Sequence, residues 1–155
     1  MMRNVQEAAS ITRRGALAVI PLALGAIATS IAFLLLRGSL PGKVATHFTL
    51  SGTADGFSSP ATALGQYMLV FGIEAVGALA VVFSVKPTRT SARAITVFSS
   101  ALAAGTAYLL IAAMEANADS NGPKVQLPIY QLVVALAVSV AIGAGAWYVA
   151  RRRHA

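Results

Sequence analysis

The sequence predicts an all-α membrane protein: a single domain, residues 1–155, in which a bundle of four transmembrane helices carries one structured extracytoplasmic loop. Three observations support this fold class. The chain is 57% hydrophobic and only 11% charged, with a mean hydropathy of +0.72. Soluble domains carry about 25% charged residues, so this chain has too few charges to cover a surface that faces water. The other two observations are four long apolar runs and an uneven distribution of basic residues between them.

The four apolar runs predict the helices in chain order. A helix rises about 1.5 Å per residue and needs about 20 apolar residues to cross the hydrocarbon core of a bilayer. Lipid offers no partners to the backbone of an open strand, so these runs are expected to be helical. The predicted helices cover residues 15–36, 64–85, 94–114 and 127–150. Only the second contains an acidic or basic residue, Glu74.

The start of the first helix also resembles an export signal, because Arg13-Arg14 precedes an apolar stretch. That stretch is longer than the roughly 7–15 residues of a signal peptide's apolar region. It is therefore expected to remain as the first membrane span.

Lysine and arginine lie mostly on one side of the predicted helices. Nine of the twelve precede the first helix, connect the second to the third, or follow the fourth: Arg3, Arg13, Arg14, Lys86, Arg89, Arg93, Arg151, Arg152 and Arg153. The other three are Arg37, Lys43 and Lys124. Basic residues accumulate on the cytoplasmic side of membrane proteins. The sequence therefore predicts a multi-pass protein of the bacterial plasma membrane, with both termini cytoplasmic and the loop 37–63 outside.

Several function classes are disfavoured. The net charge of +7 does not indicate a nucleic-acid partner, because the basic residues flank apolar runs without interleaved aromatics. The chain has no cysteine, which excludes disulfides and Cys-based metal sites. Its sequence has no Ser-His-Asp arrangement, no paired carboxylates in one loop and no phosphate-binding glycine loop. We therefore expect a protein that is not an enzyme, that needs no cofactor, and whose first partner is the lipid bilayer.

The loop 37–63 is expected to be ordered. Three turn-forming dipeptides predict chain reversals: Pro41-Gly42, Ser51-Gly52 and Asp55-Gly56. Residues 44–50 form a candidate extended segment between the first two. The apolar side chains of Phe48, Leu50 and Phe57 are expected to anchor the loop on the helix bundle or on the headgroup layer. By contrast, the acidic segment 115–121 is interpreted as a solvated connection.

Within this loop, eight residues follow the pattern LP-x-x-V-x-x-HF-x-x-x-G-x-x-D-G: Leu40, Pro41, Val44, His47, Phe48, Gly52, Asp55 and Gly56. The pattern resembles the signature of a bacterial and archaeal membrane domain of unknown function that the Sdp immunity protein family shares. The resemblance extends over roughly residues 15–85. The Sdp immunity protein protects its producer from a secreted peptide toxin and holds a repressor at the membrane. The resemblance therefore implies an immunity- or signalling-type protein whose outer loop meets a peptide or membrane-protein partner.

His47 and Asp55 are the loop residues best suited to chemistry. Histidine changes its charge near physiological pH, and Asp55 lies close to it in the sequence. One interpretation is structural, with both side chains bonded to the backbone of the loop. The others are partner recognition, pH sensing and a metal ion that His47 shares with Asp55. Metal is the weakest of these, because zinc requires three or four protein ligands, so no metal site is predicted.

Glu74 is the candidate residue inside the membrane. It lies about 15 Å along the second helix, near the midplane, where a charged carboxylate costs about 2.5–3.5 kcal/mol. It is expected to face the bundle interior, together with Gly77 and Ala78. A neutral carboxyl group bonded to a hydroxyl is expected; the candidates by depth are Thr29, Ser30, Thr106 and Tyr108. The alternative function is a small transport or ion-coupled membrane component that uses Glu74.

The fourth helix carries two rows of small residues at four-residue spacing: Ala135, Ser139 and Gly143, and Ala137, Ala141 and Gly145. Small residues let helix backbones approach closely in a membrane. Two interpretations remain open for these rows. They pack within the monomer, or they form a homo-oligomer through helix 4.

Overall fold

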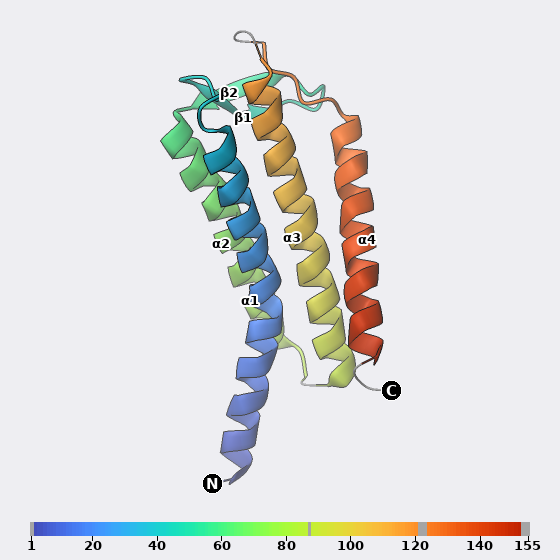
Figure 1. Cartoon of the computed structure of the whole chain (residues 1–155). Helices are drawn as coiled ribbons and strands as arrows, with labels where there is room; N and C mark the ends of the chain where they lie inside the picture. The colour runs from blue at the N-terminus through green and yellow to red at the C-terminus, as the bar shows by residue number, and fades with distance from the viewer. Residues whose placement is uncertain (1, 87, 121–123, 153–155) are drawn as a thin grey trace.

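The computed structural model consists of four long helices and a two-stranded hairpin (Figure 1). It describes residues 2–86, 88–120 and 124–152, so that Arg153 lies outside the described residues. The elements are α1 (Met2–Leu36), β1 (Val44–Phe48), β2 (Ala54–Ser58), α2 (Pro60–Ser84), α3 (Arg89–Ala118) and α4 (Tyr130–Arg152). All four helices are long and apolar enough to cross a membrane. The predicted class, a bundle of four transmembrane helices, is confirmed.

The helices begin and end at different residues from the apolar runs, because capping groups rather than hydropathy set their ends. Ser59 caps α2, accepting a hydrogen bond from the Thr62 N–H, and Pro60 occupies the first helical position. Thr88 and Ser91 form a reciprocal capping box at the start of α3. α4, in contrast, begins later than predicted, at Tyr130 instead of residue 127, because the residues directly before it are not helical. The predicted bounds were therefore too short for α1 to α3.

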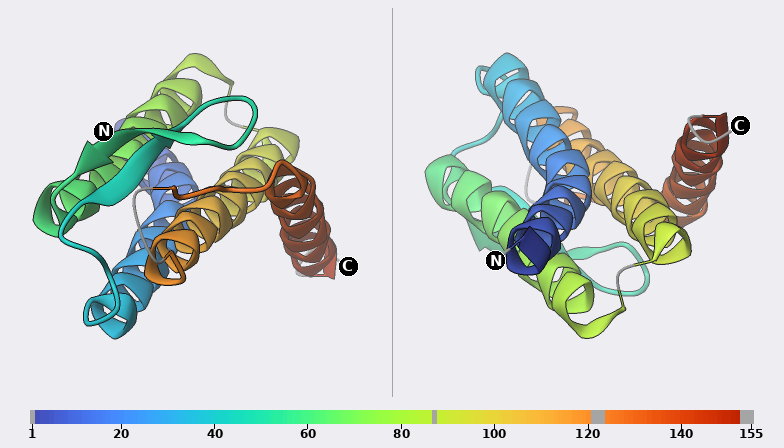
Figure 2. Two further views of the ribbon diagram at one scale, coloured as in Figure 1. Left: turned by 90° about the horizontal axis from the view of Figure 1, so that it is seen from above. Right: turned by 90° about the horizontal axis from the view of Figure 1, so that it is seen from below.

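The helices run alternately up and down (Figure 1). We call the two ends of the bundle the terminal end and the hairpin end. The terminal end is where α1 and α3 begin and where α2 and α4 end. α1 packs along both α2 and α3, whereas α2 and α3 touch each other much less. α4 packs against α3 and lies at the edge of the bundle (Figure 2).

Two clusters of buried side chains hold α1, α2 and α3 together. The larger cluster includes Leu22, Phe71 and Ala103. The second lies under the hairpin and includes Phe33, Tyr67, Met114 and Val44 of β1. Large apolar side chains are exposed along α1, α2 and α4 and at Phe98 of α3, as expected for helices whose surroundings are lipid.

Close helix contacts depend on glycine at two positions. A Cβ at Gly25 of α1 would lie 2.9 Å from the Phe71 ring and 3.1 Å from the Ala103 carbonyl oxygen. A Cβ at Gly105 of α3 would collide with the Ser139 hydroxyl of α4. Both positions therefore bring helix backbones closer together than any larger residue would allow.

The two small-residue rows of α4 have different surroundings. Ala135 and Gly143 are buried, and Gly143 lies against Ala101 and Val97 of α3. The row that contains Ser139 therefore packs within the monomer. In the other row Ala137, Ala141 and Gly145 are exposed, so self-association through these residues stays a prediction.

The hairpin lies across one end of the bundle (Figure 1). β1 and β2 are antiparallel, with Ala45 opposite Phe57 and His47 opposite Gly56, and the register shifts on both sides of His47. The expected extended segment thus corresponds to β1. The reversal expected at Asp55-Gly56 was wrong, because both residues lie inside β2. Glycine is needed there for another reason: a Cβ at Gly56 would lie 2.8 Å from the Cβ of His47.

Candidate functional site

A buried asparagine fixes the base of the hairpin to α3. Asn117 is fully buried, and its Oδ1 accepts a hydrogen bond of 2.6 Å from the N–H of Ala45. Its Nδ2 donates to the carbonyl oxygens of Ala45 (3.1 Å) and Ala113 (2.8 Å). The side chain therefore forms hydrogen bonds with both backbone groups of Ala45 in β1, as a neighbouring strand would. The interpretation of 115–121 as a solvated connection was wrong at this residue.

The tip of the hairpin is held by the segment before α4. The N–H of Leu127 donates to the carbonyl oxygen of Gly52 (2.8 Å), and the N–H of Ala54 donates to that of Val125 (3.1 Å). An antiparallel bridge joins Thr53 to Gln126 between these bonds. Residues 125–127 thus pair with the start of β2 as a short third strand, which covers backbone groups that would otherwise form an open edge.

Gly52 is the turn residue that this arrangement requires. Its φ is +82°, a region that side chains with a Cβ rarely adopt. A Cβ at this position would also collide with the carbonyl oxygen of Leu127. Glycine is therefore required at position 52 for two reasons: the turn needs a positive φ, and the segment before α4 leaves no room for a Cβ.

Most of the remaining signature residues support the hairpin. Val44 is fully buried in the cluster beneath it, and Leu40 packs against the same cluster. Pro41 and Phe48 are half-buried. Leu50 and Phe57, which we expected as anchors, are 93% and 42% exposed. They do not anchor the loop on the helices, so contact with the headgroup layer stays a prediction for these two.

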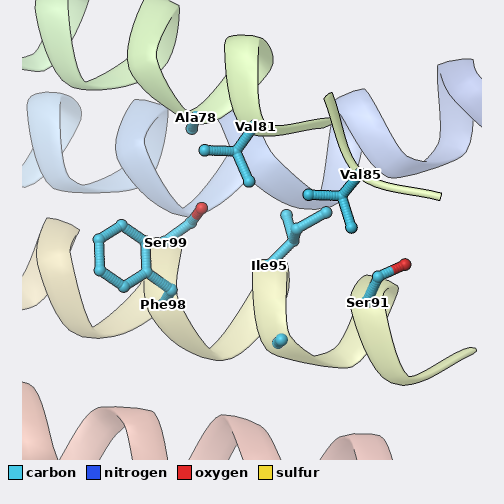
Figure 3. Close-up of a pocket in the computed structure, with 8 residues that line it drawn as sticks. Ala78, Val81, Val85, Ser91, Ile95, Phe98 and Ser99 are labelled. Atoms are coloured by element: carbon cyan, nitrogen blue, oxygen red, sulfur yellow. The ribbon is translucent and has the colours of Figure 1, made fainter. Parts of the chain in front are cut away.

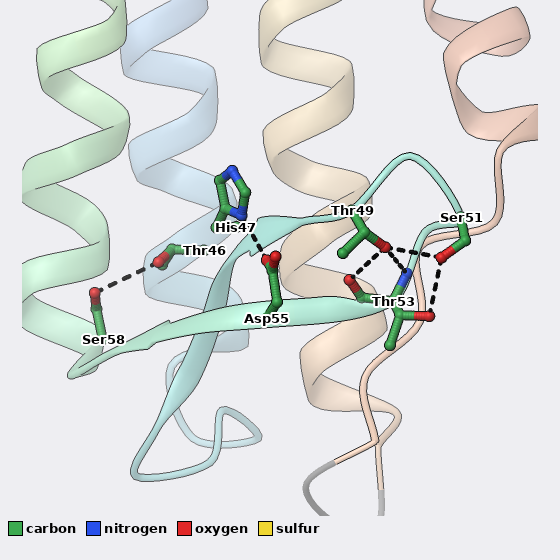
Figure 4. Close-up of polar contacts among 7 residues, drawn as sticks. All are labelled: Thr46, His47, Thr49, Ser51, Thr53, Asp55 and Ser58. Carbon is green, nitrogen blue, oxygen red and sulfur yellow. Dashed lines mark hydrogen bonds and ion pairs between the residues drawn. The ribbon is translucent and has the colours of Figure 1, made fainter.

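His47 and Asp55 form the exposed polar pair of the hairpin. Their Nδ1 and Oδ1 atoms are 2.5 Å apart, and their side chains are 74% and 46% exposed. Figure 4 shows the two side chains pointing toward each other across the strands. They bond to each other, instead of to the backbone as the structural interpretation expected.

Hydroxyl groups surround this pair. At the turn, the Thr49 hydroxyl lies 2.8 Å from that of Ser51, and a further contact joins Ser51 to Thr53 (Figure 4). The surface therefore offers one imidazole, one carboxylate and several hydroxyls as hydrogen-bonding groups. Across the residues that the structure describes, no three His, Cys, Asp or Glu side chains come together as metal ligands.

Glu74 lies apart from the hairpin, halfway along α2. The hydroxyl of Thr106 on α3 donates to Glu74 Oε1 over 2.5 Å, while Glu74 Oε2 is buried and has no partner. Of the four hydroxyl residues that were predicted from their depth as partners of Glu74, Thr106 is therefore the one that bonds to it. Ser30 instead contacts Met68, and Tyr108 donates to Gln131.

The neighbours of Glu74 on α2 only partly match the expected interior face. Ala78 is buried, but Gly77 is exposed, and a Cβ added to it would meet nothing within 4 Å. The expectation for Gly77 was wrong, because α2 makes little contact with α3 and no neighbouring helix covers α2 at this residue.

One protein family matches part of the chain: the Domain of unknown function (DUF1648) matches residues 16–70. The matched segment begins in α1, contains the whole hairpin and ends in α2. Neither Asn117 nor residues 125–127, which hold the hairpin, fall within it. No curated protein and no solved structure matches the chain. The chain is therefore a membrane protein of four apolar helices that is similar, over this segment, to a domain of unknown function.

Proposed function

We propose that this protein is a membrane interaction protein of immunity or signalling type, whose hairpin meets a peptide or membrane-protein partner. The observation that carries the proposal is the exposed His47–Asp55 pair on a hairpin fixed at both base and tip. An exposed ion pair contributes only about 0–1 kcal/mol to stability, so the fold gains little from it. A preorganised surface, by contrast, lowers the entropic cost of binding.

The chemistry of the hairpin favours an amphipathic partner. The polar pair and its hydroxyls offer hydrogen bonds, and the exposed side chains of Leu50 and Phe57 offer apolar contacts on the same hairpin. Interfaces combine apolar anchors with a surrounding polar rim in this way. A peptide with both apolar and polar side chains would find both kinds of contact here.

The proposal includes the location of the hairpin outside the plasma membrane, with both termini in the cytoplasm. The distribution of basic residues supports it. At the terminal end of α4, Arg151 lies 5.4 Å from the Trp147 ring and Arg152 lies 4.5 Å from that of Tyr148, which supports a membrane interface at this end of the bundle. Aromatic and basic residues gather in this way where a helix leaves the hydrocarbon core.

Complementation in the native host tests the proposal. A strain that lacks the gene is grown in medium conditioned by its parent, and its survival is measured. The wild-type protein should restore survival, whereas His47→Ala and Asp55→Asn should not, although both reach wild-type levels in the membrane. Asp119→Asn is the matched control, because it removes one exposed carboxylate at the same end of the bundle. Full protection by both hairpin variants would contradict the proposal.

A second candidate function, a small ion-coupled membrane component, is favoured by the buried and unpartnered Oε2 of Glu74. Ionisable side chains near the midplane are rare, and ion or proton pathways are among the functional sites that they mark. Purified protein in liposomes should then support a cation flux driven by a pH gradient. Glu74→Gln should abolish this flux and Asp55→Asn should preserve it; no flux with the wild-type protein would remove this candidate.

A further inference from the structure

A groove opens between α2 and α3 near the terminal end of the bundle. It encloses a cavity of about 190 Å³, far larger than the roughly 30 Å³ that one water molecule occupies in the liquid. Figure 3 shows Val81 of α2 and Val85, the residue that follows this helix, on one side and Ile95 and Ser99 of α3 on the other. The groove lies where α2 and α3 make little contact with each other, because α1 packs along both of them.

The groove is apolar and opens sideways. Val81, Val85 and Phe98 at its rim are 47%, 42% and 63% exposed. In a bilayer these side chains would face the acyl chains of neighbouring lipids. Ser99 lies at the bottom of the groove, and its hydroxyl is buried and has no partner. A lipid chain can therefore enter from the side without crossing a polar barrier.

A buried cation lies beside one end of this groove. Arg14 of α1 is only 6% exposed, and its Nη2 donates over 3.0 Å to the carbonyl oxygen of Val85, which lines the groove. Its Nε is buried without a partner. Among the described side chains, no carboxylate forms an ion pair with Arg14. A buried charge without a counter-ion is costly, and an anion bound beside Arg14 would offset that cost.

We propose that the groove and Arg14 together bind one anionic phospholipid, with an acyl chain between α2 and α3 and the phosphate against the Arg14 guanidinium. Guanidinium groups form strong, charge-assisted hydrogen bonds with phosphate. Lys86, exposed at the same end, adds positive charge near the headgroup. The bilayer supplies this ligand directly, and the apolar walls and sideways opening suit a chain that is already dissolved in it. The site is separate from the hairpin.

Quenching of tryptophan by brominated lipids tests the proposal. Phe98→Trp places a reporter at the rim of the groove in a chain whose native tryptophan is removed by Trp147→Phe. The full-length protein is reconstituted in phosphatidylcholine vesicles with brominated phosphatidylglycerol or brominated phosphatidylcholine. We expect phosphatidylglycerol to bind at the reporter about fivefold more strongly than phosphatidylcholine. Equal binding of the two lipids would overturn the proposal.

Arg13 provides a matched control for Arg14. Arg13 is the adjacent residue, carries the same charge and is exposed. Arg14→Gln should abolish the preference for phosphatidylglycerol, whereas Arg13→Gln should preserve it. Ala94→Phe, which fills the groove and leaves Arg14 in place, should also abolish the preference. Retention of the preference by both Arg14→Gln and Ala94→Phe would contradict the proposed site.

Thermal unfolding separates lipid binding from a purely structural role of Arg14 at the end of α2. Phosphatidylglycerol should raise the Tm of the wild-type protein above its value in phosphatidylcholine. Arg14→Gln should lower the Tm in both lipids and remove the difference between them. If Arg14→Gln lowers both Tm values equally and the difference persists, Arg14 only caps α2 and the proposal fails. Inorganic phosphate added to phosphatidylcholine vesicles should leave the Tm unchanged; an increase would assign the site to free phosphate instead.

Discussion

The side chain of Asn117 pairs with both the N–H and the carbonyl oxygen of Ala45, a residue 72 positions earlier in the chain. No other buried side chain joins the hairpin to a helix through two backbone hydrogen bonds among the described residues. This carboxamide also bonds to Ala113, one turn back along α3. At its base, the hairpin is therefore fixed to α3 by this one side chain.

Replacement of Asn117 by alanine should loosen the base of the hairpin. It leaves the buried N–H and C=O of Ala45 without partners, which costs about 1–3 kcal/mol. Hydrogen exchange at the Ala45 amide should accelerate, and the Tm should fall. Glu115→Ala is the control, because it removes an exposed polar side chain from the same turn of α3. Unchanged exchange at Ala45 in the alanine variant would show that this clamp does not hold β1.

Gly52→Ala should release the tip of the hairpin. The new Cβ meets both an unfavourable φ and the carbonyl oxygen of Leu127, and a strained residue of this kind costs about 1–3 kcal/mol. The Leu127 amide should then exchange faster. Gly42→Ala, at a loop glycine where a Cβ would meet nothing within 4 Å, should leave exchange at Leu127 unchanged. Equal effects of the two substitutions would argue against the specific contact.

The proposed orientation can be measured directly, because the chain contains no cysteine. Ser51→Cys places a single thiol at the tip of the hairpin, and Thr90→Cys places one at the start of α3; both positions are exposed. In intact cells a membrane-impermeant maleimide should label only the first. Lysed cells should label both, which checks that each thiol is reactive. Labelling of Thr90→Cys alone in intact cells would reverse the proposed topology.

Thr106→Val should destabilise the bundle more than Glu74→Gln does. The valine leaves the Glu74 carboxyl group without the only hydrogen bond that the structure gives it, at a cost of about 1–3 kcal/mol. A glutamine at position 74 can still accept the hydrogen bond from Thr106. Thermal unfolding in vesicles should therefore give a larger decrease in Tm for Thr106→Val. The opposite order would indicate that the ionisable carboxyl group itself stabilises the fold.

The two small-residue rows of α4 should respond differently to a large side chain. Gly143→Leu should separate α4 from α3, because even a Cβ at this position lies 3.3 Å from that of Ala101. Gly145→Leu should leave the monomer intact, because its Cβ meets nothing within 4 Å. If the exposed row mediates self-association, crosslinking in vesicles should show that Gly145→Leu reduces the dimer. A stable dimer in this variant would exclude that interface.

The sequence predicted the structure best in the helices, because their length and their rise per residue are regular. Apolar runs predicted the four helices, and the regular rise of a helix limited the partners of Glu74 to a few hydroxyls that include Thr106. The helix starts depended on local chemistry instead, as the caps at Ser59 and Thr88 show. Hydropathy alone therefore predicted bounds that were too short for α1 to α3 and a start that was too early for α4.

The hairpin was harder to predict because its contacts are distant in sequence or unusual. Asp55-Gly56 has the composition of a turn, yet both residues lie within β2. Glycine is needed at position 56 because it leaves room for the Cβ of His47 on the opposite strand. Asn117 lies in a polar segment that looks solvated, and no local pattern connects it to Ala45. Likewise, nothing in 125–127 indicates that these residues pair with the start of β2.

The dependence of the hairpin on Asn117 and residues 125–127 imposes an order on biogenesis. A nascent chain that has inserted only α1 and α2 already contains both strands, but the residues that clamp them have not yet been synthesised. The hairpin therefore reaches its final shape only after α3 has entered the membrane. We therefore expect that the segment 16–70 is not an autonomous folding unit in this protein, and that a chain truncated after α2 retains its spans but loses the ordered hairpin.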